Sequence, residues 1–394
     1  MINNLKCSFC SRKKTKSLKM ISNTDPSSPN CVLICQICID RCANLMNNTI
    51  PQDATEDIEP FKLLSSIEIY EKLIAKVAGQ DEPIKKISTI IYNHYKNIKY
   101  NKDTNNNHKF HSLVMGPTGS GKTMIFENIS KLLNVPCTIV DATTLTAVGY
   151  SGYDCDSCVK FLYEASGNDK DKCEMGIIVI DEFDKCRKTI TNNHKDVGGE
   201  SVQHGFLKLL DGKEVTVENK KSIFEGSSEV KINTKNILFI FCGAFSGIDS
   251  VIKNEMSSID IVLQNNENPN ALSKVNYNHL IEYGIINELV GRFYYIVACN
   301  TLTKKDLKDI ICHKENCLLQ QYKDILYLQD KIKLHFDDDA IDLIIDLAYG
   351  KCGVRSLKNI FNQVLADVMF NAPNIQKQKY IVTKDYIMSL GNLL

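Results

Sequence analysis

Residues 111–123 read HSLVMGPTGSGKT, a short apolar stretch that runs into a glycine-rich loop. The loop fits the P-loop pattern G-x-x-x-x-G-K-S/T, whose glycines bring backbone N–H groups onto phosphate oxygens, while its lysine reaches the terminal phosphates and its hydroxyl reaches Mg²⁺. The next residues, MIFENISKLL, have helical periodicity, so the motif lies between a strand and a helix, as its chemistry requires. The pattern predicts a nucleotide site made of Gly116, Pro117, Thr118, Gly119, Ser120, Gly121, Lys122 and Thr123.

A second motif supplies carboxylates at the end of another apolar run, GIIVIDEFDK, which contains Asp181 and Glu182. On its own, an acidic pair after a strand is commonly a solvated turn. At about sixty residues after a P-loop, it is typical of the Walker B motif of an ATPase, in which one carboxylate holds the Mg²⁺ shell and the next polarises the attacking water. We expect ATP and Mg²⁺ as cofactors, with Thr123 and Asp181 at the metal and with Lys122, Asp181 and Glu182 in catalysis.

Three further apolar runs, at 137–142, 236–242 and 294–299, alternate with helical stretches. This alternation predicts an α/β fold with a five-stranded parallel sheet, flanking helices and the P-loop at the carboxyl ends of the strands. The later part of the chain changes to amphipathic helices, followed by a short apolar piece, KYIVT, and a last helix. We expect a large ATPase domain over residues 66–301 and a smaller α-rich domain over residues 302–394.

The N-terminal segment carries two Cys-x-x-Cys knuckles, CSFC and CQIC, separated by a polar connector. Two such knuckles supply the tetrahedral thiolate set that Zn²⁺ accepts, which predicts a zinc site. Cys31 and Cys42 lie near the second knuckle, and we interpret them as small buried side chains. We expect a zinc-binding domain over residues 1–50 and a polar, acidic linker over residues 51–65, and the predicted zinc ligands are Cys7, Cys10, Cys35 and Cys38.

The composition restricts the class of protein and its partners. Lys plus Arg equals Asp plus Glu, 47 each in 394 residues, and this neutral balance disfavours nucleic acid as a partner. No run approaches the roughly 18 apolar residues of a membrane span, and the N-terminus offers no apolar secretory core. Sixteen cysteines in a chain of this kind indicate reduced thiols. We expect a cytoplasmic protein of the bacterial type, with an organelle matrix as the alternative.

The combination of P-loop, Walker B pair and four-cysteine head resembles the ClpX family of AAA+ protein unfoldases, and the resemblance runs nearly end to end. The segment VAGQDEPIKKISTIIYNHYK is similar to the family's nucleotide-flanking segment, which implies that Val77 and Ala78 lie beside the adenine. The segment INELVGRF resembles the one that carries the family's arginine finger. This implicates Arg292, which would reach across a subunit interface to the neighbour's terminal phosphate.

A third segment, TLTAVGYSGYD at 144–154, holds Tyr150 between glycines. In ClpX-like rings a Gly-Tyr-x-Gly loop lines the axial pore and the tyrosine grips an extended polypeptide. An aromatic ring makes a large contact with almost any side chain, which suits that role. An ordinary surface loop is the alternative. We interpret the following CDSC, residues 155–158, as buried thiols on one helix face, and His204 as a packing residue.

Three segments depart from the family pattern. In GKCGVRS, at 350–356, Cys352 stands where the family has the sensor-2 arginine, and a cysteine cannot offer phosphate a fixed bidentate charge. Ile259-Asp260-Ile261 stands where ClpP-binding relatives carry an Ile-Gly-Phe-type tip, and a simple strand or loop fragment is the alternative there. The segment 212–230 lacks the family's basic loop tip, although Lys220 and Lys221 keep some positive charge.

The resemblance implies ATP-dependent unfolding of tagged or unfolded proteins and their translocation through a homohexameric ring, with delivery to a ClpP-type protease. The zinc head would bind substrates or adaptor proteins. Two alternatives stay open. One is an ATP-driven remodelling chaperone that works without a protease, and the other is a nucleotide-binding ring subunit with little turnover that serves as a scaffold. Neither a nucleic acid nor a membrane is an expected partner.

Overall fold

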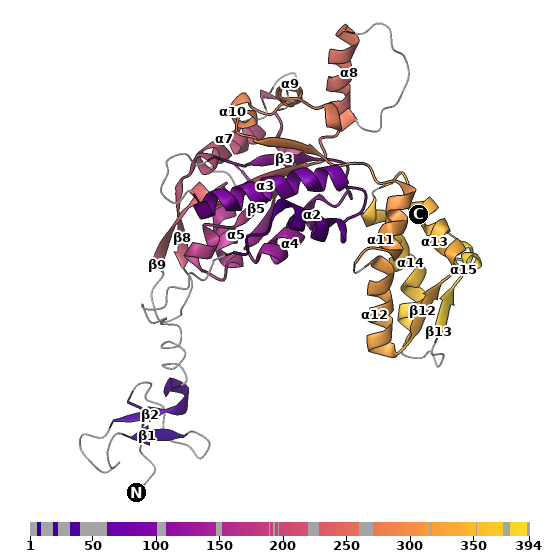
Figure 1. Cartoon of the computed structure of the whole chain (residues 1–394), viewed down its shortest axis with the longest axis horizontal. Coiled ribbons are helices and arrows are strands. Elements are labelled where there is room, and N and C mark those ends of the chain that lie inside the picture. The colour runs from indigo at the N-terminus through magenta and orange to yellow at the C-terminus, as the bar shows by residue number, and fades with distance from the viewer. Residues whose placement is uncertain are drawn as a thin grey trace. The chain divides into compact units, whose positions relative to one another are not determined.

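The chain divides into two compact units, residues 1–59 and residues 60–394. Figure 1 shows the computed structural model of the chain, coloured along the sequence. Among the described helices, none combines the length and the apolar character that a membrane span needs. The structure describes residues 6–8, 19–22, 32–39, 61–100, 108–146, 152–188, 190–191, 194–195, 197–219, 228–259, 271–315, 317–351, 353–372 and 379–391.

A five-stranded sheet forms the centre of the second unit, in the order β11-β3-β10-β5-β4. Every neighbouring pair is parallel, so the predicted parallel sheet is confirmed. The three inner strands are apolar along almost their whole length, as strands covered on both faces must be. The strands are β3 (Ser112–Met115), β4 (Cys137–Asp141), β5 (Ile177–Asp181), β10 (Leu238–Gly243) and β11 (Tyr295–Ala298).

Helices cover both faces of this sheet, because successive strand residues point to opposite sides. Ile177 and Val179 pack with α2 (Ser66–Ile74), α3 (Asp81–Tyr100) and α4 (Lys122–Leu133). Ile178 and Ile180 pack with α5 (Ser157–Ala165) and α7 (Val197–Asp211) instead. Figure 1 shows α2, α3 and α4 gathered on one side of the sheet. The result is a three-layer α/β/α core that fixes the carboxyl ends of the strands.

The segment just before α2 also belongs to this core. Phe61 and Leu64, inside the range expected as linker, are buried among the residues of α2, α3 and α4. The backbone N–H of Lys62 donates to the carbonyl of Leu133 at 3.1 Å, which ties the segment to the end of α4. Ser65 then caps α2 in a capping box with Glu68. From residue 61 onward, the chain is therefore packed against the helices α2, α3 and α4.

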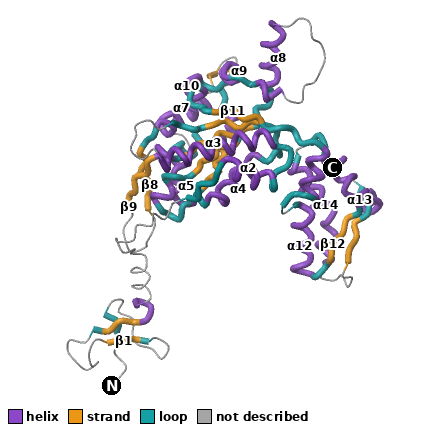
Figure 2. Tube along the Cα trace, in the orientation of Figure 1, coloured by secondary structure: helices purple, strands orange, loops and turns teal. Residues whose placement is uncertain are grey.

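The large domain also contains several further helices and short strands outside the five-stranded sheet. The antiparallel pair β8 (Glu214–Asn219) and β9 (Ser228–Asn233), which Figure 2 shows as two orange strands, was not predicted from the sequence. The remaining elements are η1 (Ala142–Thr144), α6 (Lys170–Cys173), η2 (Phe183–Cys186), β6 (Ile190–Thr191), β7 (His194–Lys195), η3 (Thr234–Asn236), α8 (Ile248–Ile259), η4 (Ala271–Lys274), α9 (Tyr277–Tyr283) and α10 (Asn287–Val290).

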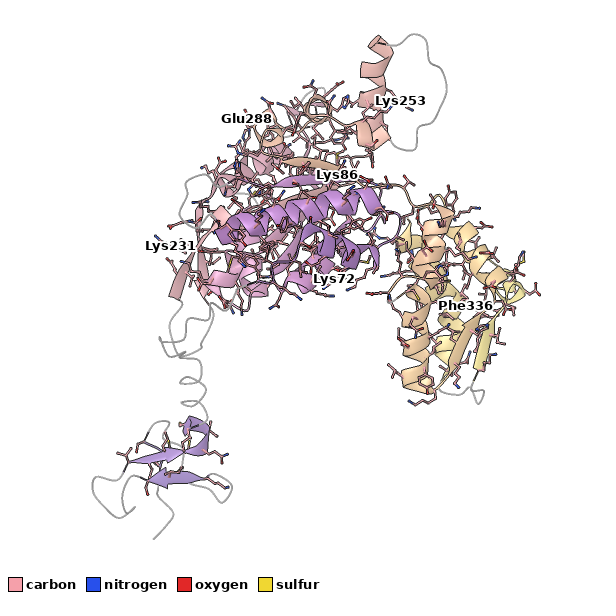
Figure 3. All side chains as sticks on the ribbon, viewed as in Figure 1. Lys72, Lys86, Lys231, Lys253, Glu288 and Phe336 are labelled. Atoms are coloured by element: carbon pink, nitrogen blue, oxygen red, sulfur yellow. The ribbon has the colours of Figure 1, made fainter. Side chains whose placement is uncertain are left out.

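The C-terminal part is rich in helix and has its own apolar core, in which Tyr322 and Phe361 stack with ring centroids 5.4 Å apart. Its only described strands are β12 and β13, which pair in parallel and place Phe336 in this core (Figure 3). The elements are α11 (Lys304–Cys312), α12 (Leu318–Asp330), β12 (Lys333–Phe336), α13 (Asp338–Ala348), α14 (Val354–Asn371), β13 (Lys379–Val382) and α15 (Lys384–Ser389).

Candidate functional site

The glycine-rich loop turns the chain from β3 into α4 at the carboxyl edge of the sheet. A side chain at Gly116 would place its Cβ 2.6 Å from Cys299 Cβ, so only glycine fits beside the end of β11. Gly121 adopts a left-handed φ of 93° and has no side chain with which to cap α4. The first N–H groups of α4 have no partners within the helix, and together with the helix dipole they favour an anion at this position.

Lys122 and Ser120 present their polar atoms inside the loop. The Lys122 side chain is buried, and its Nζ donates to the carbonyl oxygens of Gly116 at 2.7 Å and Pro117 at 3.0 Å. Ser120 Oγ is buried and makes no hydrogen bond to any part of the chain that the structure describes. A buried hydroxyl normally has a partner, so a phosphate oxygen inside the loop would satisfy it. The loop therefore fits the phosphates of a nucleotide.

The P-loop and the Walker B strand meet through one hydrogen bond. Thr123 Oγ1 donates to Asp181 Oδ2 at 3.0 Å, although the two residues lie 58 positions apart. A hydroxyl and a carboxylate side by side are oxygen ligands of the kind that Mg²⁺ prefers. Glu182 follows with a left-handed φ of 53°, and its backbone N–H donates to Asp181 Oδ1 at 2.9 Å. Non-glycine residues in this conformation concentrate at functional sites.

A third carboxylate, which the sequence analysis missed, holds the neighbouring strand in place. Asp184 is buried, and its Oδ1 accepts a hydrogen bond from the backbone of Ala244 at 3.2 Å. A side chain at Gly243 would come within 2.6 Å of the same oxygen, while the carbonyl of Gly243 accepts from the N–H of Gly116 at 3.1 Å. The end of β10 thus links the P-loop to the Walker B turn.

Val77 and Ala78 lie beside the P-loop, on the turn between α2 and α3. Both are buried, and Val77 Cγ1 is 3.9 Å from the position that a Cβ on Gly121 would take. The adjacent Gln80 is fully buried, a residue that the sequence analysis did not single out. Its Nε2 donates to the carbonyl of Asn300 at 2.9 Å and its Oε1 accepts from the N–H of Asn300 at 2.8 Å. This reciprocal pair fixes the apolar wall against the strand end after β11.

Arg292 lies at the opposite end of the strands from the P-loop, beside their amino ends. It precedes β11, which runs parallel to β3, whereas the P-loop follows β3. The guanidinium forms a bidentate pair with Asp211, with Nε to Oδ1 at 2.9 Å and Nη2 to Oδ2 at 2.8 Å. These hydrogen bonds lower the pKa of the Asp211 carboxyl. A cavity of about 410 Å³ adjoins the pair, lined in part by Lys109, Tyr277 and Tyr294. Arg292 cannot reach the P-loop of its own chain.

Three of the four predicted zinc ligands come together in the N-terminal unit. The antiparallel strands β1 (Met20–Ser22) and β2 (Leu33–Cys35) bring the sulfurs of Cys7, Cys35 and Cys38 within 4.8 Å of one another. The sulfurs of Cys7 and Cys38 are 3.9 Å apart, close to the ~3.8 Å that follows from tetrahedral Zn–S bonds of about 2.3 Å. The cluster therefore fits a metal ion. Cys10, Cys31 and Cys42 lie outside the described residues.

Comparison with known proteins gives the family. Residues 107–296 match the profile described as AAA domain (Cdc48 subfamily). A Treponema denticola protein named ATP-dependent Clp protease ATP-binding subunit ClpX is 33% identical over 95% of this chain and 92% of its own length. Relatives with the same name from Porphyromonas gingivalis (32%, covering 96% and 94%) and Bacteroides thetaiotaomicron (33%, covering 97% and 94%) align over similar spans. The chain belongs to the ClpX family. It is an AAA ATPase, as the P-loop and Walker B pair predict.

In this ClpX-family chain, the start of α14 contacts the P-loop through backbone atoms. Gly353, which precedes α14, adopts a φ of 56°, and a Cβ there would lie 2.8 Å from the carbonyl oxygen of Gly119. The N–H of Val354 donates to the same oxygen at 3.4 Å. Cys352, in the sensor-2 position, lies outside the described residues, and the side chains of Lys351 and Arg355 are exposed.

The base of the ClpX-type tyrosine loop is described, but its tip is not. The N–H of Thr146 donates to the carbonyl of Tyr153 at 2.8 Å, and the N–H of Tyr153 donates to the carbonyl of Thr144 at 3.3 Å. Gly152 has a φ of 148°, and a Cβ there would meet the Thr146 side chain at 2.5 Å. Two backbone hydrogen bonds therefore hold the two sides of the loop together at its base. Tyr150 lies outside the described residues.

Two sequence interpretations need correction. Cys155 and Cys158 are buried, and burial raises the pKa of Cys155 to about 12, but α5 begins only at Ser157, so Cys155 lies in the preceding turn and not on the helix. His204 was expected to pack in the core, and it is exposed. The buried polar residue of that helix is its neighbour Gln203, which donates to the carbonyls of Cys186 at 2.7 Å and Gly284 at 3.1 Å.

Proposed function

We propose that this ClpX-family chain couples ATP hydrolysis to the unfolding of protein substrates, translocates them through a homohexameric ring and delivers them to a ClpP-type protease. The observation that carries the proposal is the hydrogen bond from Thr123 to Asp181, which joins the P-loop to the Walker B strand. The relatives' name, Clp protease ATP-binding subunit, supports the choice of a protease partner. The division into residues 1–50, 51–65, 66–301 and 302–394 belongs to the same proposal.

The residues of the site suit phosphoryl transfer, in which positioning and charge stabilisation supply most of the catalysis. Lys122 and the loop N–H groups would bind the β- and γ-phosphates, and Val77 and Ala78 would pack against the base. Thr123 and Asp181 would hold Mg²⁺, which when bound neutralises charge that develops on the phosphates. Glu182 would accept a proton from the attacking water and orient the lone pair of the water oxygen toward the γ-phosphorus. Arg292 would stabilise the transition state in a neighbouring subunit.

Tyr150 is proposed to grip the substrate, so Tyr150→Ala should separate hydrolysis from mechanical work. We expect ATP turnover to remain near that of the wild type, because Tyr150 is not among the residues proposed to bind or hydrolyse the nucleotide. Unfolding of a tagged fluorescent substrate should fall to background. Tyr100→Ala, at a tyrosine that is 67% exposed on α3, provides the matched control and should unfold the substrate normally. If Tyr150→Ala unfolds the substrate as the wild type does, the assignment of Tyr150 to the axial pore is wrong.

The cysteine cluster is proposed to bind zinc and to build the surface that receives substrates or adaptors. Cys35→Ser should remove the metal and unfold the head, because structural zinc contributes about 10–16 kcal/mol to small domains of this kind. Metal analysis by atomic emission and rapid trypsin cleavage of the first unit would report both effects. Cys317→Ser, at a partly buried thiol outside the cluster, is the control. Full zinc retention in Cys35→Ser would contradict the ligand assignment.

The protease partner and the compartment are further parts of the proposal. Ile259 ends α8, so the residues before it form a helix, and Asp260 and Ile261 lie outside the described residues. Co-sedimentation with a ClpP-type protease distinguishes a protease subunit from a stand-alone remodelling chaperone. The proposed compartment is a cytosol-like one, in which the cysteines of a large chain of this kind stay reduced.

A further inference from the structure

Two elements of the large domain bring Asp211 and Arg292 together. Asp211 is the last residue of α7, and Arg292 follows α10 after one glycine. Their neighbours Leu210 and Val290 are both buried in the same apolar cluster, and α7 and α10 are in contact. Apolar burial therefore fixes the backbone on both sides of the pair. The carboxylate and the guanidinium are therefore both attached to backbone that adjoins a helix.

The hydrogen bonds of Arg292 leave part of its guanidinium available in a fixed orientation. An arginine has five N–H donors in a planar fork. Nε and one hydrogen of Nη2 bind Asp211, and one hydrogen of Nη1 binds the carbonyl of Glu288 at 2.7 Å. Figure 3 labels Glu288, on α10. One hydrogen of Nη1 and one of Nη2 remain for another acceptor, and N–H donors of an arginine form strong, charge-assisted hydrogen bonds with phosphate oxygens.

The surroundings of the pair indicate orientation as its role. The Arg292 side chain is 32% exposed and that of Asp211 is 60% exposed, so the ion pair contributes little to folding stability. Lys109 is the other charged residue described along the cavity, and its Nζ is held by the carbonyl of Lys235 at 2.6 Å. His111 is buried between the carbonyl of Leu210 and the N–H of Phe239, an arrangement that suits a neutral ring. Asp211 thus has Arg292 as its bonded partner.

We propose that Asp211 is the positioning residue of the arginine finger: its carboxylate holds the Arg292 guanidinium with the remaining donors directed outward, ready for the terminal phosphate bound by the next subunit. This inference rests on the proposed function of Arg292. A planar group that is already oriented loses less conformational freedom when it engages the phosphate. Asp211 touches neither nucleotide nor Mg²⁺ and would act only through Arg292.

Asp211→Ala should lower kcat for ATP hydrolysis by about 10- to 100-fold, as expected when a catalytic group loses its alignment. The KM for ATP should stay within about twofold of the wild type, because the chain's own P-loop lies at the opposite end of the strands. Asp211→Glu should restore most of the rate, since it keeps a carboxylate at an exposed position, and Asp211→Asn should not. Asp342→Ala, which breaks the exposed 2.9 Å pair with Lys308, is a control of equal charge change and should keep full activity.

A double-mutant cycle separates positioning from a structural effect. Asp211→Ala should have no further effect in an Arg292→Ala background, because a residue that acts through Arg292 is silent without it. Ring formation, followed by light scattering, and the thermal midpoint should be the same in all variants. An unchanged or increased kcat in Asp211→Ala, or a loss that multiplies with that of Arg292→Ala, would overturn the inference. If Arg292→Ala itself hydrolyses ATP normally, the proposed finger fails instead, so the two failures are distinguishable.

Discussion

Arg292→Ala should lower kcat for ATP hydrolysis by about 1,000-fold, the lower end of the range that arginine fingers contribute. The physical reason is the loss of a fixed cation at the point where charge develops on the transferring phosphoryl group. Nucleotide affinity should change little, because Lys122 and the loop N–H groups stay in place. Steady-state turnover and equilibrium binding of a fluorescent ATP analogue would measure the two effects. Lys308→Ala, which removes an exposed cation from the C-terminal part, is the control and should remain active.

Mixing experiments test whether Arg292 acts on a neighbour. In a ring that contains Arg292→Ala and Glu182→Gln subunits, an Arg292→Ala subunit keeps its own Glu182 and can receive the finger of the other variant. Two inactive proteins should then regain part of the hydrolysis when they are mixed and allowed to exchange subunits. The opposite positions of Arg292 and the P-loop on the parallel strands motivate this expectation. A mixture as inactive as its components would rule out action in trans.

Glu182→Gln should abolish turnover while ATP still binds. The loss of a general base costs about 100- to 10,000-fold in rate, and the amide cannot accept the proton of the attacking water. Gln keeps the size of the side chain, and the backbone hydrogen bond from residue 182 to Asp181 should persist. Measurement of phosphate release, with an unfolded polypeptide added in a parallel series, gives the wild-type rate against this blank. Glu164→Gln, at an exposed glutamate on α5, should behave as the wild type.

The outcome of that series also separates the rival functions. Hydrolysis that responds to polypeptide and disappears in Glu182→Gln would fit a working motor that tolerates Cys352. If the wild type binds nucleotide but hydrolyses it no faster than the blank, the scaffold alternative gains support. The same result would show that the contact at Gly353 does not replace the missing arginine.

The sheet and the nucleotide loop were predictable because their signals are local. A strand that is buried on both faces reads as a short apolar run, as in Ile177–Asp181, and the P-loop pattern specifies its own strand and helix. The Cys-x-x-Cys spacing likewise indicated a cluster, and Cys7, Cys35 and Cys38 do meet. In each case the residues that form the feature are either adjacent or repeated at a spacing that chemistry dictates.

Contacts between distant segments carried no such signal. The pair of Asp211 and Arg292 joins residues 81 positions apart, and the pair of Gln80 and Asn300 joins residues 220 positions apart. Nothing in the local pattern around Gln80 distinguishes it from an exposed polar residue. His204 and Gln203 show the same limit on a helix, where adjacent positions point in directions about 100° apart and a shift of one residue exchanges the buried and exposed sides.

Gly353 gives the C-terminal part a link to the P-loop that does not depend on charge. A sensor arginine reports the presence of phosphate through electrostatic attraction, which dissolved salt weakens over about 10 Å at 0.1 M. The contact between the backbones of Gly119 and Val354 is steric instead, since a displaced carbonyl of Gly119 would push directly against the start of α14. Such a joint would transmit movement of the loop equally well in dilute and in concentrated salt, whatever side chain occupies position 352.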